Sequence, residues 1–379
     1  MTVTTTAIAG AEELEDLRLS VRSLLADKSD ESRVREVMES DLGYDASVWR
    51  QRADQVGVQS LAVPEHHGGA GFGQVELGVA LRELGRALVP GPFFSSVVLG
   101  AGALLAAQDE SAMAAHLPGI AAGTTLATLA VIETDGQWRT HGFTTRARED
   151  GEASWTLDGE KSLVLDAVGA DLYVVAADTP HGPGLFLVES GAAGLEVTGL
   201  RALDPTRRVG RLTLTGTPAA ALGRPGNGTA ALEHLLDRAT AALAAEQVGA
   251  ARACLEMSVA YARQRVQFGR PIGSFQAVKH MCADMFTRLE VAEAAATEAA
   301  RAVDGLPDAP PAGEAAAVAH AVCSEAFMFI AQQTIQVHGG IGFTWEHPAH
   351  LYFRRAKVSQ LMFGGPAVYY ERLLERWGV

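Results

Sequence analysis

A short segment beginning at Arg265 combines side chains that can bind a phosphate and a flat aromatic ring. It reads Arg265-Val-Gln267-Phe268-Gly269-Arg-Pro271-Ile-Gly273-Ser-Phe275-Gln276. An arginine guanidinium can donate two parallel hydrogen bonds to a phosphate, and a glutamine amide can both donate and accept. Aromatic rings on either side can pack against the ligand. The segment therefore predicts a binding site for a ligand that carries both phosphates and a ring.

A glycine-rich segment follows, with Gln336 placed 60 residues after Gln276. It reads Gln336-Val-His338-Gly339-Gly340-Ile-Gly342-Phe343. Glycine lets a backbone approach a ligand closely, although Gly339 and Gly340 could also simply end a helix in a left-handed conformation. Similarly, Arg265 could form a surface salt bridge, and the two glutamines could cap helix ends. We favour ligand contact for Arg265, Gln267, Phe268, Gln276, Gln336, Gly339 and Gly340.

In this order and spacing, the two segments resemble the C-terminal helical domain of the acyl-CoA dehydrogenase family of flavoproteins. The resemblance implies that these residues contact FAD. In that family FAD lies across a subunit interface: the β domain of one subunit holds the ring, and the Arg-x-Gln-Phe-Gly segment of its neighbour holds the pyrophosphate and adenylate. The resemblance also implies an acyl-CoA substrate and electron-transfer flavoprotein as the electron acceptor.

The order of helix-like and strand-like segments along the chain predicts an α+β multi-domain fold. We expect an N-terminal helical domain over residues 1–122, a middle β-barrel or sheet domain over 123–226, and a C-terminal four-helix bundle over 227–379. Apolar spacing predicts a first helix from about Glu12 and another over 75–88. Runs rich in Thr, Val and Leu predict strands over 126–132, 153–157, 172–176, 185–189 and 211–214. The C-terminal helices are expected over 232–263, 275–303 and 313–336.

Residues 61–71 are expected to form a bend and not a phosphate cradle, because no Lys-Ser/Thr pair opens a helix there. They read Leu61-Ala-Val-Pro64-Glu65-His66-His67-Gly68-Gly69-Ala-Gly71. The segment matches the "VPEEYGGxG" loop that the resembled family carries before its next helix.

The catalytic base of the family has no counterpart here. Family members use a Glu to remove the proton beside the thioester carbonyl while a hydride leaves the next carbon for the flavin. Ungapped counting along the family pattern "RDAKxxxIYEGTxEI" places that base at Phe363. A second branch of the family places it, counted back from Gly249, at Ala239. Neither side chain can take a proton, so Glu246 is the remaining candidate, about 11 Å from Ala239 along a helix; a buried structural glutamate is its default interpretation.

The β domain also departs from the family pattern. The segments "TEPxAGSD" and "WITNA", which line the flavin ring in the family, correspond to Ala130–Gly136 and Lys161–Ala167, although the frame Asp158-Gly-Glu-Lys161 is kept. This chain keeps the segment that would hold the FAD adenylate but lacks the segments that would hold the flavin ring. In this it resembles the base-lacking subunit of heterotetrameric relatives that degrade sterol side chains. We therefore expect a homologous partner subunit that carries the catalytic Glu. Two alternatives remain: a complete homo-oligomeric enzyme with a displaced base, and a flavin-free scaffold on the same fold.

Composition narrows the other possibilities. The net charge of −14 disfavours a nucleic-acid partner, which needs Lys and Arg to displace counterions. We expect no membrane insertion, because no apolar run of about 18 residues is apparent, and no signal peptide, because the start lacks a basic region and an apolar core. Three widely spaced cysteines indicate free thiols and, with these features, a cytoplasmic protein. His338 and His347 lack partners at metal-ligand spacing, so no metal site is predicted.

Overall fold

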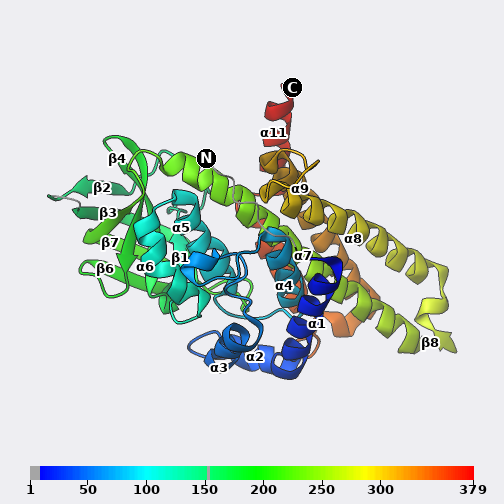
Figure 1. The fold of residues 1–379 in the computed structure, drawn as a ribbon. Coiled ribbons are helices and arrows are strands. Elements are labelled where there is room, and N and C mark those ends of the chain that lie inside the picture. The colour runs from blue at the N-terminus through cyan, green and yellow to red at the C-terminus, as the bar shows by residue number, and fades with distance from the viewer. Residues whose placement is uncertain (1–8, 152–153) are drawn as a thin grey trace. The chain divides into compact units, whose positions relative to one another are not determined.

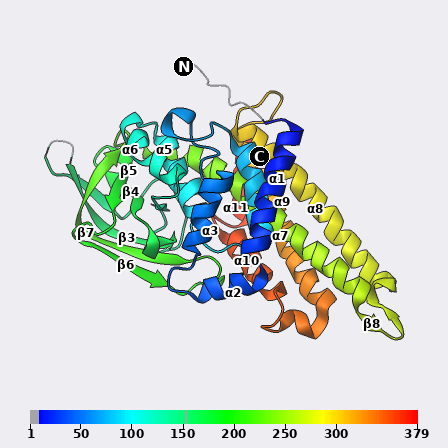
Figure 2. The ribbon, with the colours of Figure 1, turned by 60° about the horizontal axis from the view of Figure 1, so that its bottom comes forward.

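The structure is a computed structural model that describes residues 9–151 and 154–379. The predicted absence of a signal peptide concerns Met1–Ile8, and one predicted strand begins at Ala153; both lie outside the described residues. Contacts divide the chain into two compact units. The first, called the β unit here, contains Val37–Gly73 and Pro90–Ala239, and the second, called the helical unit, contains Ala9–Glu36, Gln74–Val89 and Thr240–Val379. Figures 1 and 2 show the course of the chain in two views.

The β unit combines short helices with a seven-stranded sheet. Its α-helices are α3 (Ala46–Gln51), α5 (Ala101–Ala107) and α6 (Glu110–Ala121), with further helical turns over Arg52–Val56, Glu65–His67 and Phe93–Gly100. Its strands are β1 (Ala127–Ala130), β2 (Arg146–Glu149), β3 (Ser154–Leu165), β4 (Leu172–Thr179), β5 (Gly182–Glu189), β6 (Leu195–Leu200) and β7 (Val209–Leu222).

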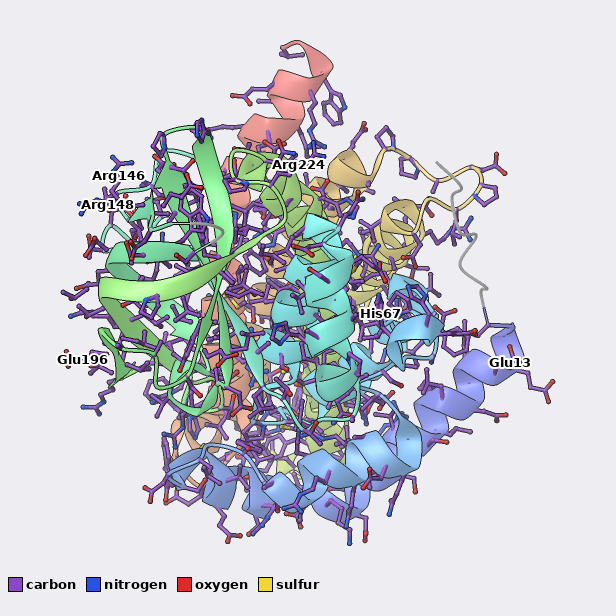
Figure 3. The ribbon with its side chains drawn as sticks, turned by 60° about the vertical axis from the view of Figure 1, so that its left-hand side comes forward. Glu13, His67, Arg146, Arg148, Glu196 and Arg224 are labelled. Carbon is purple, nitrogen blue, oxygen red and sulfur yellow. The ribbon has the colours of Figure 1, made fainter. Side chains whose placement is uncertain are left out.

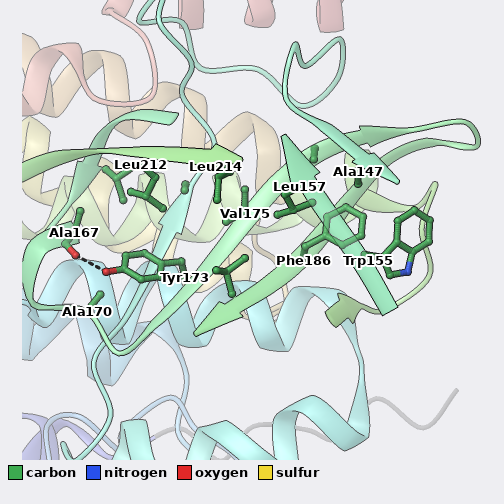
Figure 4. Close-up of a cluster of buried hydrophobic side chains, with 14 residues drawn as sticks. Ala147, Trp155, Leu157, Ala167, Ala170, Tyr173, Val175, Phe186, Leu212 and Leu214 are labelled. Atoms are coloured by element: carbon green, nitrogen blue, oxygen red, sulfur yellow. Dashed lines mark hydrogen bonds between the residues drawn. The ribbon is translucent and has the colours of Figure 1, made fainter. Parts of the chain in front are cut away.

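The sheet closes on itself, which confirms the predicted middle β domain. The strands pair in the order β4-β2-β3-β7-β5, and β5 pairs again with β4, while β1 adds to β4 and β6 adds to β7. Alternate side chains fill the interior, as Figure 4 shows for Trp155 and Phe186, whose ring centroids lie 5.2 Å apart. The hydroxyl of Tyr173 donates to the carbonyl of Ala167 at 2.8 Å, so the polar tip of this buried tyrosine is satisfied.

Two strands of the β unit were missed by the sequence analysis, and four, β3, β4, β5 and β7, extend beyond their predicted ranges. β2 exposes three of its four residues, and β6 alternates apolar and polar residues only over Leu195–Thr198 before Gly199 interrupts the pattern. β3 continues past Leu157 through Asp158-Gly159, because a β-bulge there lets the strand carry residues that normally mark a turn. A Cβ on Gly159, whose φ is +150°, would lie 2.7 Å from the Cα of Thr145, so glycine is required at this crossing.

The helical unit contains long helices joined by short turns. They are α1 (Ala11–Lys28), most of α2 (Glu31–Glu39), α4 (Gln74–Arg86), the larger part of α7 (Gly228–Gln264), α8 (Gln276–Val303), α9 (Ala312–His338), α10 (Ala349–Leu361) and α11 (Pro366–Trp377). A hairpin of β8 (Val266–Gln267) and β9 (Arg270–Pro271) connects α7 to α8. α8, α10 and α11 all pack against α9, which confirms the predicted C-terminal helical bundle. The helices predicted to begin near residues 12 and 75 are likewise observed, as α1 and α4.

One helix is more apolar than the sequence analysis expected. The range Ala312–Phe343 has a window with mean hydropathy 1.4 and is long enough to cross a membrane. Within the protein, however, 67% of that window is buried, as in the central helix of a bundle. The three cysteines are free, and Cys254 and Cys323 are buried.

α4 and α7 cross with their backbones almost in contact. A Cβ on Gly249 would lie 1.8 Å from the carbonyl oxygen of Arg82, and one on Gly85 would lie 2.1 Å from that of Glu246. Both obstacles are backbone atoms of a neighbouring helix, so they cannot turn aside as a side chain could. Gly249, the glycine from which the second family base position was counted, therefore has a packing role in this chain.

We expect Gly249→Ala to lower the free energy of unfolding by at least about 2 kcal/mol, because the added methyl forces the two helices apart. Urea unfolding followed by far-ultraviolet circular dichroism measures this loss. Gly340→Ala is the matched control, since no atom lies within 4 Å of the position of its Cβ. Equal unfolding midpoints for the two variants would contradict the packing argument.

Candidate functional site

The helical unit brings the two segments that we predict to bind a ligand to the same end of its bundle. α7 and α9 run parallel: the Gln247 side chain donates to Ser324 at 3.0 Å, and further along Thr334 donates to the carbonyl of Cys254 at 3.3 Å. At the last turn the rings of Tyr261 and His338 lie 4.4 Å apart. Since α7 leads into residues 265–276 and α9 leads into residues 336–343, both segments emerge together.

The first segment forms an exposed hairpin between α7 and α8, visible at the β8 label in Figure 1. Phe268 stands at its tip with φ +53° and with 91% of its surface exposed. Phe275 is held by the chain itself, because the Arg270 guanidinium lies 4.1 Å from its ring centroid. The hairpin therefore presents Phe268 outward while Phe275 supports its base.

The polar side chains of both segments are free to bind a ligand. Arg265, Gln267, Gln276 and Gln336 are exposed, and no hydrogen bond or ion pair links their side chains to any other described residue. The structure thus shows neither the salt bridge considered for Arg265 nor the helix capping considered for the glutamines. Four exposed polar groups without partners among the described residues leave their donors and acceptors available to a phosphate-bearing ligand.

The two glycines that follow α9 leave open space. Gly339 ends the helix with φ +64° and ψ −141°, a conformation that favours glycine but is not the left-handed helical one. Gly340 has no such backbone requirement, and no atom lies within 4 Å of the Cβ position of either residue. The chain's own packing therefore gives no reason for glycine at Gly340, whereas close approach of a ligand or a second chain does.

Large apolar side chains surround these groups. Val266, Phe343 and Trp345 are 54%, 81% and 50% exposed, in addition to Phe268. Exposed apolar side chains gathered in one region mark a surface that another molecule covers. The two segments at this end of the bundle therefore carry both polar side chains without partners in the described part of the chain and large exposed apolar side chains.

Neither position that the resemblance assigns to the catalytic base carries an acid. Phe363 follows α10 with φ +61° and is 4% exposed, and Ala239 is fully buried within α7. Glu246, the remaining candidate, accepts a hydrogen bond from Nη1 of Arg355 at 2.7 Å, and both side chains are buried. The interpretation of Glu246 as a structural glutamate agrees with this contact.

Comparisons with known proteins identify the family. Residues 11–124 match the N-terminal domain of acyl-CoA dehydrogenases, and residues 226–377 match their C-terminal domain. Acyl-CoA dehydrogenase IpdE2 of Mycobacterium tuberculosis is 37% identical over 362 residues, which cover 96% of this chain and 96% of that protein. The chain belongs to the acyl-CoA dehydrogenase family.

Solved structures agree with this assignment. The Tcur3481-Tcur3483 steroid ACAD is 35% identical, with a TM-score of 0.85 over 96% of this chain and 97% of its own. A chain of the ChsE4-ChsE5 complex from Mycobacterium tuberculosis is 30% identical, with a TM-score of 0.88, and the match covers 98% of this chain and 98% of that chain. Family membership makes the chain an FAD-dependent acyl-CoA oxidoreductase, and the free polar groups and open glycines at the end of the bundle fit that cofactor.

The two segments of the β unit that differ from the acyl-CoA dehydrogenase pattern, around Glu133 and Lys161, are joined by a buried ion pair. Nζ of Lys161 donates to the Glu133 carboxylate at 3.0 Å, and neither side chain reaches solvent appreciably. Thr144 and Thr145 each donate a backbone N–H and a hydroxyl to the same carboxylate. Burial alone would raise the pKa of Glu133, but these donors outweigh it and lower that pKa to about 2.

We expect Glu133→Gln to lower the free energy of unfolding at neutral pH by about 3 kcal/mol, since the pKa of this carboxyl falls from 4.5 to about 2 on folding. The sign follows from the lowered pKa: the stabilisation is complete above pH 4.5 and is lost as the pH falls toward 2. The stability difference between wild type and variant should therefore narrow over that window, which urea titrations at several pH values measure. A difference that does not change with pH would contradict the assignment.

One cavity of the helical unit is lined mainly by charged side chains. It measures about 480 Å³, and its lining includes Arg18, Arg22, Glu83, Arg86 and Glu256. Its charges largely compensate one another, as where Arg22 pairs with Glu83 at 2.8 Å. None of the predicted cofactor residues lines it.

Proposed function

We propose that this chain is the subunit of a hetero-oligomeric acyl-CoA dehydrogenase that lacks the catalytic base, and that a homologous partner supplies the Glu. The contact between Glu246 and Arg355 carries the proposal. A carboxylate held at 2.7 Å by a buried guanidinium is stabilised in its charged form and is a poor proton acceptor. With Phe363 and Ala239 at the family base positions, the chain offers no evident base of its own.

The role of the chain in the complex is to complete the cofactor site of its partner. Arg265 would fork onto the FAD pyrophosphate, the side-chain amides of Gln267 and Gln276 would bind the adenylate half, and Gly340 would let the dinucleotide approach the backbone. FAD, when bound, accepts the hydride from the acyl chain. The exposed rings of Phe268 and Phe343 would be covered by the partner subunit.

The nature of the relatives supports both the partner and the substrate. Two structural neighbours are named as complexes of two proteins, ChsE4-ChsE5 and Tcur3481-Tcur3483, and the latter is named as a steroid ACAD. By this likeness we propose an acyl-CoA thioester with a steroid-derived acyl group as substrate. A cytoplasmic location and electron-transfer flavoprotein as the acceptor complete the proposal.

The test compares the chain alone with the chain co-expressed beside a homologue that keeps the base. Alone, it should contain little FAD and oxidise no acyl-CoA, because it lacks the ring-binding segment and the base. With the partner it should form a stable complex that contains fewer FAD molecules than subunits and reduces them with acyl-CoA. Phe363→Glu in the isolated chain should not restore activity, since the flavin ring would still lack its platform.

Two results would overturn the proposal. A homo-oligomer of this chain that carries one FAD per subunit and reduces it with an acyl-CoA would favour a complete enzyme with a displaced base. An isolated chain and co-expressed complex that both lack flavin would favour the scaffold alternative.

A further inference from the structure

Three potential metal ligands of the β unit converge beside its glycine-rich turn. His66 and His67 lie in the helical turn Glu65–His67, and Glu110 is the first residue of α6. Their ligand atoms all lie within 4.8 Å of one another. Nε2 of His67 is 3.3 Å from Oε1 of Glu110, and Nε2 of His66 is 4.0 Å from the same oxygen. The sequence analysis missed this group because Glu110 is far from the two histidines in the chain.

Within this cluster, the His67 side chain gives the strongest indication of a ligand. It is only 3% exposed, and its Nε2 is buried without a hydrogen-bond partner, although it faces the Glu110 carboxylate. A buried polar atom without a partner costs about 1–3 kcal/mol, so its presence calls for an explanation. Figure 3 labels His67 within the β unit.

We propose that His66, His67 and Glu110 bind a divalent cation of the zinc type, with water completing the coordination. Bonds of about 2.0–2.1 Å in tetrahedral geometry place neighbouring ligand atoms about 3.3 Å apart. The separation of His67 and Glu110 already meets this value, 3.3 Å. His66 must move about 0.7 Å closer to Glu110 and at most about 1.5 Å closer to His67, which its 68% exposed side chain permits. Two imidazoles with one carboxylate suit Zn²⁺ and not Mg²⁺ or Ca²⁺, which prefer oxygen ligands.

The backbone that carries the two histidines is held in place before any metal binds. The N–H of His67 donates to the carbonyl of Pro64 at 3.0 Å, and that of Gly68 donates to Glu65 at 2.9 Å. A Cβ on Gly69 would lie 1.9 Å from the carbonyl oxygen of Val63, so the turn requires glycine there. The turn is thus rigid enough to present both imidazoles from adjacent positions.

The start of α6 is fixed as well. The Asp109 side chain caps the helix by accepting from the N–H groups of Ser111 and Ala112, each at 3.1 Å, and its second oxygen accepts from Gly223 at 3.0 Å. The positive end of the helix dipole opposes a cation, but the carboxylates of Asp109 and Glu110 offset it. A bound metal would therefore fasten the glycine-rich turn to α6, a tie that the "VPEEYGGxG" pattern, with Glu and Tyr at the two histidine positions, does not contain.

The experiment titrates Zn²⁺ into the full-length chain after removal of metals with a chelator, and follows binding by calorimetry. We expect one Zn²⁺ per chain at this site. His66→Gln and Glu110→Gln should each weaken Zn²⁺ affinity at least about tenfold. Both side chains are largely exposed, 68% and 70%, so these variants should fold, which circular dichroism checks. His116→Gln, on the same helix outside the cluster, is the control and should bind as wild type does.

A second readout is independent of calorimetry. Saturating Zn²⁺ should raise the melting temperature of wild type and of His116→Gln, and should raise that of the two ligand variants less, because binding to the native state alone stabilises it. Wild-type protein that shows no saturable Zn²⁺ binding would overturn the proposal. So would unchanged affinity in both ligand variants, which would assign any bound metal to other histidines or cysteines.

Discussion

Arg265→Ala is expected to lower the affinity of the assembled enzyme for FAD by about 10- to 150-fold. The substitution removes a charge-assisted bond from guanidinium to phosphate, worth about 1.5–3 kcal/mol, and each 1.4 kcal/mol corresponds to a factor of ten. Because the guanidinium is exposed and forms no contact with other described side chains, the fold of the chain should not change. Flavin absorbance per subunit after dialysis, together with acyl-CoA turnover before and after added FAD, measures the effect.

The matched control for this prediction is Arg263→Ala. Arg263 is also exposed and lies in the last turn of α7, but it stands outside the segment assigned to FAD. Its replacement removes the same charge from the same region and should leave flavin content unchanged. If both variants lose FAD equally, general electrostatics and not a specific phosphate contact would explain the loss; if neither does, Arg265 does not bind the cofactor.

Arg355→Met is expected to lower the free energy of unfolding by about 3–5 kcal/mol, the usual cost of leaving one partner of a buried ion pair uncompensated. Glu246 would keep its buried carboxylate after the guanidinium 2.7 Å away is gone. Glu246→Gln combined with Arg355→Met should recover much of the loss, because the remaining amide carries no charge. Urea unfolding of Arg355→Met, Glu246→Gln and the double variant measures these differences.

The same variants separate structure from catalysis at Glu246. In the assembled enzyme, Glu246→Gln should retain most turnover per bound flavin, since the amide keeps the shape and part of the hydrogen bonding of the acid. Removal of a true general base should instead cost roughly 10²-fold or more. A loss of that size at unchanged flavin content would assign the proton transfer to Glu246 and make this chain a complete enzyme.

Sequence alone was sufficient for the features that depend on local pattern. Apolar spacing located the long helices α7, α8 and α9 to within a few residues, and Thr- and Val-rich runs located the core strands. The motif around Arg265 and the glycines after α9 indicated the family, because the residue types expected to bind a dinucleotide occur within two short segments. The absence of an acid at Phe363 and Ala239 could also be read from the chain, by counting.

Only the tertiary structure decided which distant side chains meet. Glu246 and Arg355 are 109 residues apart in the chain, and only the fold brings them into a buried ion pair at 2.7 Å. Likewise, Glu133 is held ionised by donors from the Thr144 region and from Lys161, and His67 faces Glu110 only because α6 packs beside its turn. The parallel course of α7 and α9 places the two segments that we predict to bind FAD at the same end of the helical bundle. Periodicity records which face of an element is buried, but burial, distance and therefore pKa depend on what packs against that face, and this is set by the whole fold.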